Sequence, residues 1–324
     1  MSLRNVTLRQ LKVFEAVARH LSFSRAAEEL HLTQPAVSMQ VQGLEQLVEL
    51  PLTEQIGKRI RLTAAGDELA RQARLIAQQL REGEEAIAAM KGAEAGRLVI
   101  GVVSTAKYFA PTLLAEFSRR HPRIELRLSV NNRGAIVRQL ADNEIDLAIM
   151  GSPPRDLDTV DEVFSDHPLV FIAHPAHPLA ARKRIEPSQL AEHLLLIREP
   201  GSGTRTTLER FLEGKGVRAG ETLEMGSNET IKQAVMAGMG IAFISEHTIG
   251  LERLVGRLAI LPVTGTPLMR QWHLVHRREK RLLPAAEAFR QFMRSEAMRL
   301  IDIQVGNPAP IAPSPAPVRR RRAT

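Results

Sequence analysis

The sequence has no cysteine among its 324 residues. A chain without thiols can form neither a disulfide framework nor a thiolate metal site, and this composition is typical of the reducing cytoplasm. No apolar run reaches the length of a membrane span, and the first residues show no secretory signal pattern. We therefore expect a cytoplasmic protein. Its length predicts two or three domains, and 44% hydrophobic residues are enough for ordinary soluble cores.

Residues 21–45 are the most informative stretch, because they predict two short helices joined by a tight turn. Ser24 is expected to cap the first of these helices at its N-terminus. The apolar residues of this helix form one inward stripe: Ala26, Ala27 and Leu30. The two alanines are small enough for a second helix to cross closely. This pattern indicates a helix-turn-helix.

The second helix is expected to span about 34–48 and to enter a DNA groove. Thr33 is placed to cap it, and Pro35 falls in its first turn, where a missing N–H costs nothing. Its inward residues are Val37, Val41 and Leu44. The residues expected against DNA are Thr33, Gln34, Pro35, Ser38, Met39, Gln40 and Gln42.

The segments before and after this helix pair predict a winged helix-turn-helix. Upstream, a helix is expected with one apolar face, formed by Leu8, Leu11, Phe14 and Val17 or Ala18. Downstream, Pro51 breaks the chain, and residues 55–62 predict a small hairpin that turns at Gly57. The hairpin is expected to carry three cations to DNA phosphates: Lys58, Arg59 and Arg61. An isolated amphipathic helix pair is more often purely structural, but this context favours a DNA-binding domain over residues 1–62.

The positive charge of the chain is unevenly placed. Residues 1–62 hold eight Lys or Arg against six Glu, so this domain carries only +2 of the total net charge of +8. This favours recognition by helix insertion and dimer geometry over a large electrostatic footprint. Residues 304–324 are rich in Pro and Ala and contain four consecutive arginines, 319–322, and are expected to form a disordered basic tail. The tail is either a solvated extension or a non-specific phosphate anchor.

A long linker helix is expected over residues 63–92, with Thr63 as its cap. Its apolar stripe has close to heptad spacing and contains Leu69, Ala73, Ile76, Leu80, Ile87 and Met90. Such a helix needs a partner helix, so we expect it to form a dimer. A two-fold dimer would place both recognition helices on one face of double-stranded DNA, which predicts an interrupted palindrome as the binding site. A hinge is expected at 92–96.

From residue 97 onward, strand and helix patterns alternate, which predicts βαβ units of a parallel sheet. We expect a two-lobed, periplasmic-binding-protein-like α/β effector domain at 93–303 that closes on a ligand. Lobe I is expected at about 97–165 and 270–303, and lobe II at about 166–269. The predicted fold is thus multidomain, α plus α/β.

Ligands of open α/β sheets bind beyond the C-terminal ends of strands, against helix N-termini. The loops there are rich in hydroxyl, amide and free backbone N–H groups, which suits a small anionic effector. The expected effector residues are Ser104, Thr105, Lys107, Asn131, Arg133, Gly151, Ser202, Gly203, Thr204, Arg205 and Asn228. Arg205 follows two glycines at a helix start, so it is favoured as the anion ligand. The alternative is a helix-capping loop in which Arg205 forms a surface ion pair.

These motifs resemble those of the LysR-type transcriptional regulators over nearly the whole chain. The matching segments are 11–14, 22–30, 33–41, 44–45 and 62–66. The resemblance implies that Gln34, Pro35 and Ser38 lie against the operator and that the wing contacts the DNA backbone. Two residues depart from the family pattern: Glu49 stands where Gly is usual, and Thr53 replaces a usual Phe. We expect both to weaken packing between recognition helix and wing without loss of function.

Within the family, three loops are most similar to regulators of carbon-fixation operons, the CbbR type that controls RuBisCO genes: 102–111, 198–205 and 226–232. The resemblance implies an effector such as a sugar phosphate or NADPH, and a tetramer that bends DNA, with RNA polymerase as a further candidate partner. Reasoning from the residues alone supports only the dimer. The alternative is a LysR-type regulator of another metabolic operon with a different small anionic effector.

Three other classes of protein fit less well. An enzyme would need a catalytic set or metal site, but the ten histidines are scattered, and His174 and His177 lie in a proline-containing loop without further ligands. Residues 201–206 lack the third glycine of a dinucleotide fingerprint. A solute-binding protein would need a signal peptide and would leave residues 1–62 unexplained, and a nucleoid protein would not need two lobes. We expect no enzymatic activity, no metal and no cofactor.

Overall fold

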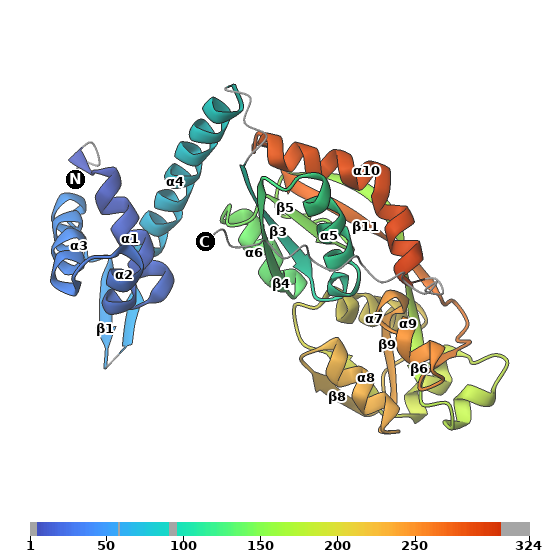
Figure 1. Ribbon diagram of the computed structural model, residues 1–324. Helices are drawn as coiled ribbons and strands as arrows, with labels where there is room; N and C mark the ends of the chain where they lie inside the picture. The colour runs from blue at the N-terminus through green and yellow to red at the C-terminus, as the bar shows by residue number, and fades with distance from the viewer. Residues whose placement is uncertain (1–4, 58, 91–95, 306–324) are drawn as a thin grey trace, which may run out of the picture.

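The computed structural model describes residues 5–57, 59–90 and 96–305 (Figure 1). Lys58, most of the expected hinge and the tail from residue 306 lie outside the described residues. Among the helices of the described part, none combines the length and apolarity needed to cross a membrane.

The N-terminal unit is a three-helix bundle followed by a two-stranded hairpin. Its elements are α1 (Leu8–His20), α2 (Phe23–Leu30), α3 (Gln34–Val48), β1 (Thr53–Ile56) and β2 (Arg59–Leu62). The three helices share one buried core, in which Phe14, Val17, Ala26, Val37 and Leu44 are fully or almost fully buried. The core thus holds α3 with its polar side away from α1 and α2.

Two details of this unit differ from the sequence prediction. Ser22, not Ser24, caps α2, because the backbone is still extended at Ser22 and its Oγ accepts a hydrogen bond from the Arg25 N–H at 3.3 Å. Ser24 is therefore the second residue of α2, and it is exposed. Leu8 is 54% exposed rather than buried, because it is the first residue of α1 and precedes the part that contacts α2 and α3.

The long helix α4 (Ala64–Met90) begins against the base of the hairpin. Thr63 caps it as expected, since its Oγ1 accepts a hydrogen bond from the Gly66 N–H at 3.0 Å. Leu69 and Ala73 of the apolar stripe pack into the core of the N-terminal unit. Further along the same stripe, three residues are exposed: Ile76, Leu80 and Ile87. The side chain of Met90 lies outside the described residues.

The effector domain is built on one mixed sheet of nine strands. Their bounds are β3 (Gly96–Val103), β4 (Ile124–Asn131), β5 (Leu147–Met150), β6 (Thr159–Ala173), β7 (Leu195–Arg198), β8 (Thr222–Met225), β9 (Ile241–Ser245), β10 (Ala259–Leu261) and β11 (Leu268–Arg277). The order is β4-β3-β5-β11-β6-β9-β7-β8, with β10 paired to β6. As predicted, β3 to β5 form parallel pairs, and β7 to β9 form a second parallel group.

The two parallel groups are joined by the antiparallel pair β6 and β11. The first part of β6 and the second part of β11 lie in the half of the sheet with β5, whereas residues 169–172 of β6 pair with β9. Two crossing strands therefore connect two lobes, an arrangement that permits hinge motion. The expected parallel βαβ groups are thus joined by two strands, β6 and β11, that run antiparallel to each other through both lobes.

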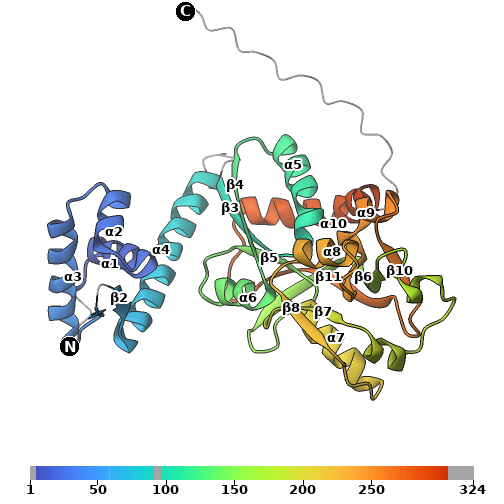
Figure 2. The same ribbon diagram turned by 90° about the horizontal axis from the view of Figure 1, so that it is seen from below.

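Helices cover both halves of the sheet (Figures 1 and 2). They are α5 (Ala110–Arg120), α6 (Arg133–Ala141), α7 (Gly203–Gly214), α8 (Asn228–Met236), α9 (Gly250–Leu254) and α10 (Pro284–Val305). A short 3-10 turn, η2 (Ala106–Tyr108), precedes α5. Similar turns are η3 (Pro178–Ala181), η4 (Pro187–Glu192) and η5 (Glu246–Thr248).

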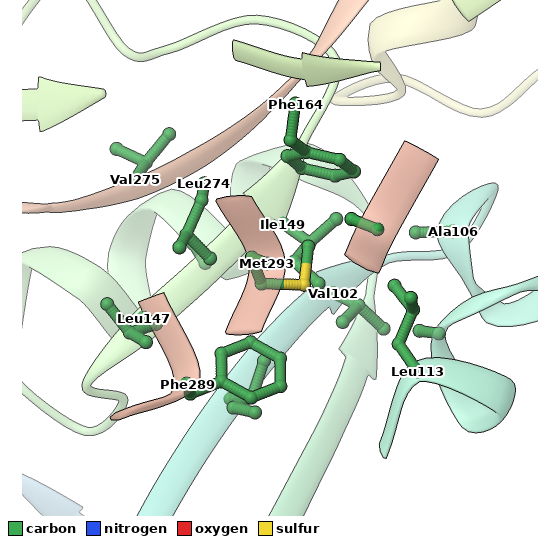
Figure 3. Packing of buried hydrophobic residues seen from close by; sticks show 14 of the residues in the cluster. Val102, Ala106, Leu113, Leu147, Ile149, Phe164, Leu274, Val275, Phe289 and Met293 are labelled. Atoms are coloured by element: carbon green, nitrogen blue, oxygen red, sulfur yellow. The ribbon is translucent and has the colours of Figure 1, made fainter. Parts of the chain in front are cut away.

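The C-terminal helix α10 returns to the first lobe, as predicted, and continues to Val305. Phe289 and Met293 of α10 pack with Val102, Ile149 and Leu274 of three different strands (Figure 3). Lobe II has a separate core on each face of its half of the sheet, one under α7 and one under α8. These cores fix the positions of the carboxyl ends of both groups of parallel strands.

Candidate functional site

The outer surface of α3 carries most of the polar residues expected to contact DNA. Gln34, Met39 and Gln42 are exposed, with Met39 at 70%. Ser38 is half-buried and its Oγ accepts a hydrogen bond from Gln34 Nε2 at 3.1 Å. The other expected contact residues here are the exposed Thr33 and Pro35 and the half-buried Gln40. Amide and hydroxyl groups on such a surface can pair with base edges in a major groove.

The hairpin β1–β2 forms the expected wing. Thr53 pairs with Leu62 and Ile56 pairs with Arg59, and the turn contains Gly57 at φ +63°, a conformation that glycine adopts without strain. Arg59 and the wing residue Arg61 are exposed, so both are available to phosphates.

The connection between α3 and the wing depends on Glu45. Its Oε1 accepts hydrogen bonds from the backbone N–H groups of Leu52 at 2.8 Å and Thr53 at 3.2 Å. Glu49 ends α3 in the left-handed region, at φ 61° and ψ 24°, which explains why glycine is favoured at this position. The structure thus identifies a strained helix end at Glu49 and a hydrogen-bonded anchor at Thr53.

A small hollow lies between the two lobes of the effector domain. Seven of the residues expected at the effector site line it: Ser104, Thr105, Arg133, Gly151, Ser202, Gly203 and Thr204. Five further residues complete the lining: Val103, Asn132, His167, Arg198 and Arg270. The hollow lies at the carboxyl ends of β3 and β7 and at the N-termini of α6 and α7, where the sheet rule places a ligand.

Two of the three lining arginines have no carboxylate partner within 4.0 Å in the part of the chain that the structure describes. Arg133 donates to the carbonyl oxygens of Ser152 and Pro153, at 3.3 and 3.1 Å. Arg270 donates to the carbonyl oxygens of Gly203 and Gly151 and to Thr207 Oγ1. Burial, with repulsion from Arg133 and Arg210, lowers the pKa of Arg270 to about 10. Burial, with repulsion from Arg210, likewise lowers the pKa of Arg133 although Asp156 acts in the opposite direction, so neither arginine of the hollow is paired with a carboxylate among the described residues.

The third arginine, Arg198, is 3% exposed and has an anionic partner. Its Nε lies 2.7 Å from Glu199 Oε2, and another N–H group donates to Asn228 Oδ1. Its Nη2 also donates to Ser104 Oγ of the other lobe at 3.0 Å. Arg198 therefore connects the lobes at the edge of the hollow.

Four residues expected at the effector site lie outside the lining. Asn228 accepts a hydrogen bond from Arg198 at its Oδ1 and does not itself line the hollow. Asn131 donates to Ser129 Oγ, and its neighbour Asn132 reaches the hollow instead. Lys107 lies over the Tyr108 ring, 5.2 Å from its centre.

Arg205 forms ion pairs with Glu209 at 2.9 Å and Glu224 at 2.6 Å. The choice of Arg205 as the anion ligand does not match this placement, whereas the alternative of a surface ion pair does. The physical reason is that Arg205 lies two residues beyond Gly203 in α7, and a helical turn of about 200° carries its side chain away from the hollow.

The sequence reasoning missed His167 and Arg270 as lining residues. The two residues are direct partners in the antiparallel register of β6 and β11, although they are 103 positions apart in the chain. In the sequence, each of the two is only a polar residue beside an apolar strand segment. The pairing of β6 with β11 brings their side chains to the hollow.

Comparison with known proteins shows the family. Residues 8–67 match the bacterial regulatory helix-turn-helix proteins of the lysR family, and residues 91–298 match the LysR substrate binding domain. The chain is a LysR-type transcriptional regulator. The predicted fold class, a winged helix-turn-helix followed by a two-lobed effector domain, is thereby confirmed.

Relatives of this LysR-type regulator are similar over almost their whole length. It is 52% identical to the RuBisCO operon transcriptional regulator of Allochromatium vinosum over 296 residues, which are 91% of this chain and 98% of the relative. It is 48% identical to the transcriptional regulator CfxR of Cupriavidus necator over 308 residues, 95% of this chain and 97% of the relative. These named relatives are transcriptional regulators, not enzymes.

Solved structures agree with this LysR-type fold. The regulatory domain of Synechocystis CcmR in complex with 2-PG is 39% identical, with a TM-score of 0.60, and covers 61% of this chain and 96% of that chain. Full-length CbnR complexed with its target DNA is 24% identical, with a TM-score of 0.63, and covers 89% of this chain and 99% of that chain, which supports the fold.

Proposed function

We propose that this LysR-type regulator controls a carbon-fixation operon that contains RuBisCO genes and that it responds to a small phosphorylated metabolite. The genetic target is supported by relatives named for RuBisCO operons at about half identity over nearly the full chain. The effector is proposed to bind in the hollow between the lobes.

One observation carries the effector proposal: Arg133 and Arg270 face the hollow and donate only to uncharged oxygens. A buried guanidinium without a counter-charge is costly, and an anion that enters the hollow would relieve this cost. The N-termini of α6 and α7 add further attraction for negative charge. The similarity to a regulatory domain solved with 2-PG supports the same chemistry.

On the DNA side, we propose that α3 inserts into the major groove and that Arg59 and Arg61 of the wing contact phosphates. Pairing of two α4 helices through Ile76, Leu80 and Ile87 would set the distance between two recognition helices. The dimer would then bind an interrupted palindrome. Assembly of such dimers into a tetramer is proposed from the family resemblance.

Binding of anions to matched arginine variants tests the effector site. Calorimetric titration with 2-phosphoglycolate, ribulose 1,5-bisphosphate and NADPH should give binding for at least one of these anions. Arg133→Gln should weaken that binding about 10- to 100-fold, because a charge-assisted hydrogen bond contributes about 1.5–3 kcal/mol. Arg205→Gln is the matched control, since it also removes one arginine charge, but from a residue that lies outside the hollow and pairs with Glu209 and Glu224.

The outcomes separate the two candidate arginines. Equal loss of affinity in both variants would contradict the assignment of the site to the hollow. Loss in Arg205→Gln alone would restore the loop at 201–205 as the anion site. Failure of all three anions would favour the alternative, a LysR-type regulator of another operon with a different effector.

A further inference from the structure

His167 has an unusual position in the hollow. The residue is 2% exposed, and it lines the space between the lobes. Neither Nδ1 nor Nε2 has a hydrogen-bond partner in the described part of the chain. A buried polar atom without a partner is costly, so such atoms are rare unless they serve a function.

Neighbouring groups fix the orientation of the His167 ring. It stacks on Trp272, with 3.9 Å between ring centres and 15° between the planes. Gly151 approaches the ring so closely that a Cβ atom there would lie 2.7 Å from Nδ1. The ring is thus held in place by packing beside the hollow, and both of its buried nitrogens lack a partner among the described residues.

The electrostatic surroundings keep His167 neutral when no anion is bound. Burial, followed by repulsion from Arg270 and from His247, holds the pKa of His167 well below its ordinary value. His247 of η5 is itself neutral near pH 7, because burial lowers its pKa to about 4. The other charged groups around this pair are Arg133 of α6, Arg198 of β7, Arg210 of α7, Asp302 of α10 and Asp166, which precedes His167 on β6.

We propose that His167 binds the anionic group of the effector as an imidazolium, so that one proton is taken up with the effector. This inference rests on the proposed function, because it needs an anion in the hollow. The negative charge of the effector would offset the repulsion by Arg270, and each protonated ring nitrogen is a donor for an anionic oxygen. A further consequence is specificity, since phosphate esters would bind much better than uncharged analogues of the same size.

The proton uptake of His167 makes effector binding depend on pH. The pKa of His167 is low without the effector and is raised by the bound anion, so binding takes up a proton and affinity falls as pH rises. Between the two pKa values, affinity should fall about tenfold for each unit of pH.

Calorimetry in buffers of different ionisation enthalpy measures this proton directly. The probe is 2-phosphoglycolate, titrated into the full-length protein between pH 6.5 and 8.5. We expect uptake of about one proton by the wild type beyond that taken up in the His167→Gln variant, because the phosphate of the probe titrates in both. His247→Gln is the matched control, since this ring also contacts Trp272 but does not line the hollow.

Several outcomes would overturn the inference. Equal proton uptake by the wild type and His167→Gln would do so, and so would loss of uptake in His247→Gln alone. At pH 8.5, where the phosphate of the probe is already ionised, zero uptake by the wild type would overturn it even if the variant failed to fold. Binding with a flat pH profile refutes only the role of His167. Absence of 2-phosphoglycolate binding at any pH rules out this anion and the role of His167 in binding it, and failure of ribulose 1,5-bisphosphate and NADPH as well refutes the proposed phosphorylated effector.

Discussion

Glu49 ends the recognition helix in a backbone conformation that residues with a Cβ atom rarely adopt. Its φ of 61° places it in the left-handed region, and its N–H donates to the Glu45 carbonyl at 2.8 Å. The left-handed conformation costs roughly 1–2 kcal/mol for an L-residue and almost nothing for glycine. The chain therefore carries local strain between α3 and the wing.

Replacement of Glu49 by glycine should stabilise the N-terminal unit. We expect Glu49→Gly to raise the free energy of unfolding by about 0.5–1 kcal/mol, since relief of strain exceeds the added entropy of the unfolded chain. Urea unfolding followed by circular dichroism measures the change. The control is Gln46→Gly, an exposed position inside α3, which should lose about 1 kcal/mol. Equal destabilisation by both would show that the strain at Glu49 is negligible.

At the scale of elements, the recognition helix presents a small polar cluster. The hydrogen bond from Gln34 to Ser38 joins two successive turns at the N-terminal end of α3. This end enters the groove in helix-turn-helix proteins, so the two side chains are placed to read base edges together.

Truncation of this cluster should reduce specific binding to the operator. Ser38→Ala and Gln34→Ala are each expected to weaken it about 5- to 100-fold, because base contacts of this kind contribute about 1–3 kcal/mol. Binding to unrelated DNA should change little, since the wing phosphate contacts remain. Fluorescence anisotropy with specific and random duplexes measures both affinities. Gln46→Ala, three turns along the same helix, is the control and should behave as the wild type.

The elements differ in how far the sequence predicts them. The bounds of α3 were predicted correctly, because its start and end depend on local signals such as Thr33 and the apolar spacing of Val37, Val41 and Leu44. The pairing of β6 with β11 could not be predicted, because it depends on contacts between distant segments. Dependence on distant segments also limits prediction of the hollow. Its loop residues are predicted by the sequence, whereas His167 and Arg270 are not.

At the scale of the whole molecule, hydrogen bonds hold the two lobes together around the hollow. Arg198 bonds to Ser104, the Gly134 N–H donates to the Gly201 carbonyl at 3.1 Å, and the Tyr108 hydroxyl donates to Glu229. A ligand in the hollow would alter these contacts and hence the relative position of the lobes. Such a change is a means by which the effector could act on dimer packing.

The assembly also depends on the exposed stripe of α4. Leu80→Gln should weaken dimerisation, because each copy of Leu80 would bury apolar area worth roughly 1.5–3 kcal/mol in a dimer. Sedimentation equilibrium measures the dissociation constant. Arg71→Gln is the control, since nine residues place it about 180° around the helix from Leu80. An unchanged dimer in Leu80→Gln would show that the stripe is not the interface.

The central claim is that an anion between the lobes controls binding to the DNA of a carbon-fixation operon. Footprinting and gel shift on the region upstream of the RuBisCO genes, with and without 2-phosphoglycolate, test it most directly. We predict a specific complex whose footprint or affinity changes with the anion in the wild type, while Arg133→Gln forms the same complex and does not respond. Absence of a specific complex, or an equal response in the wild type and Arg133→Gln, would contradict the account.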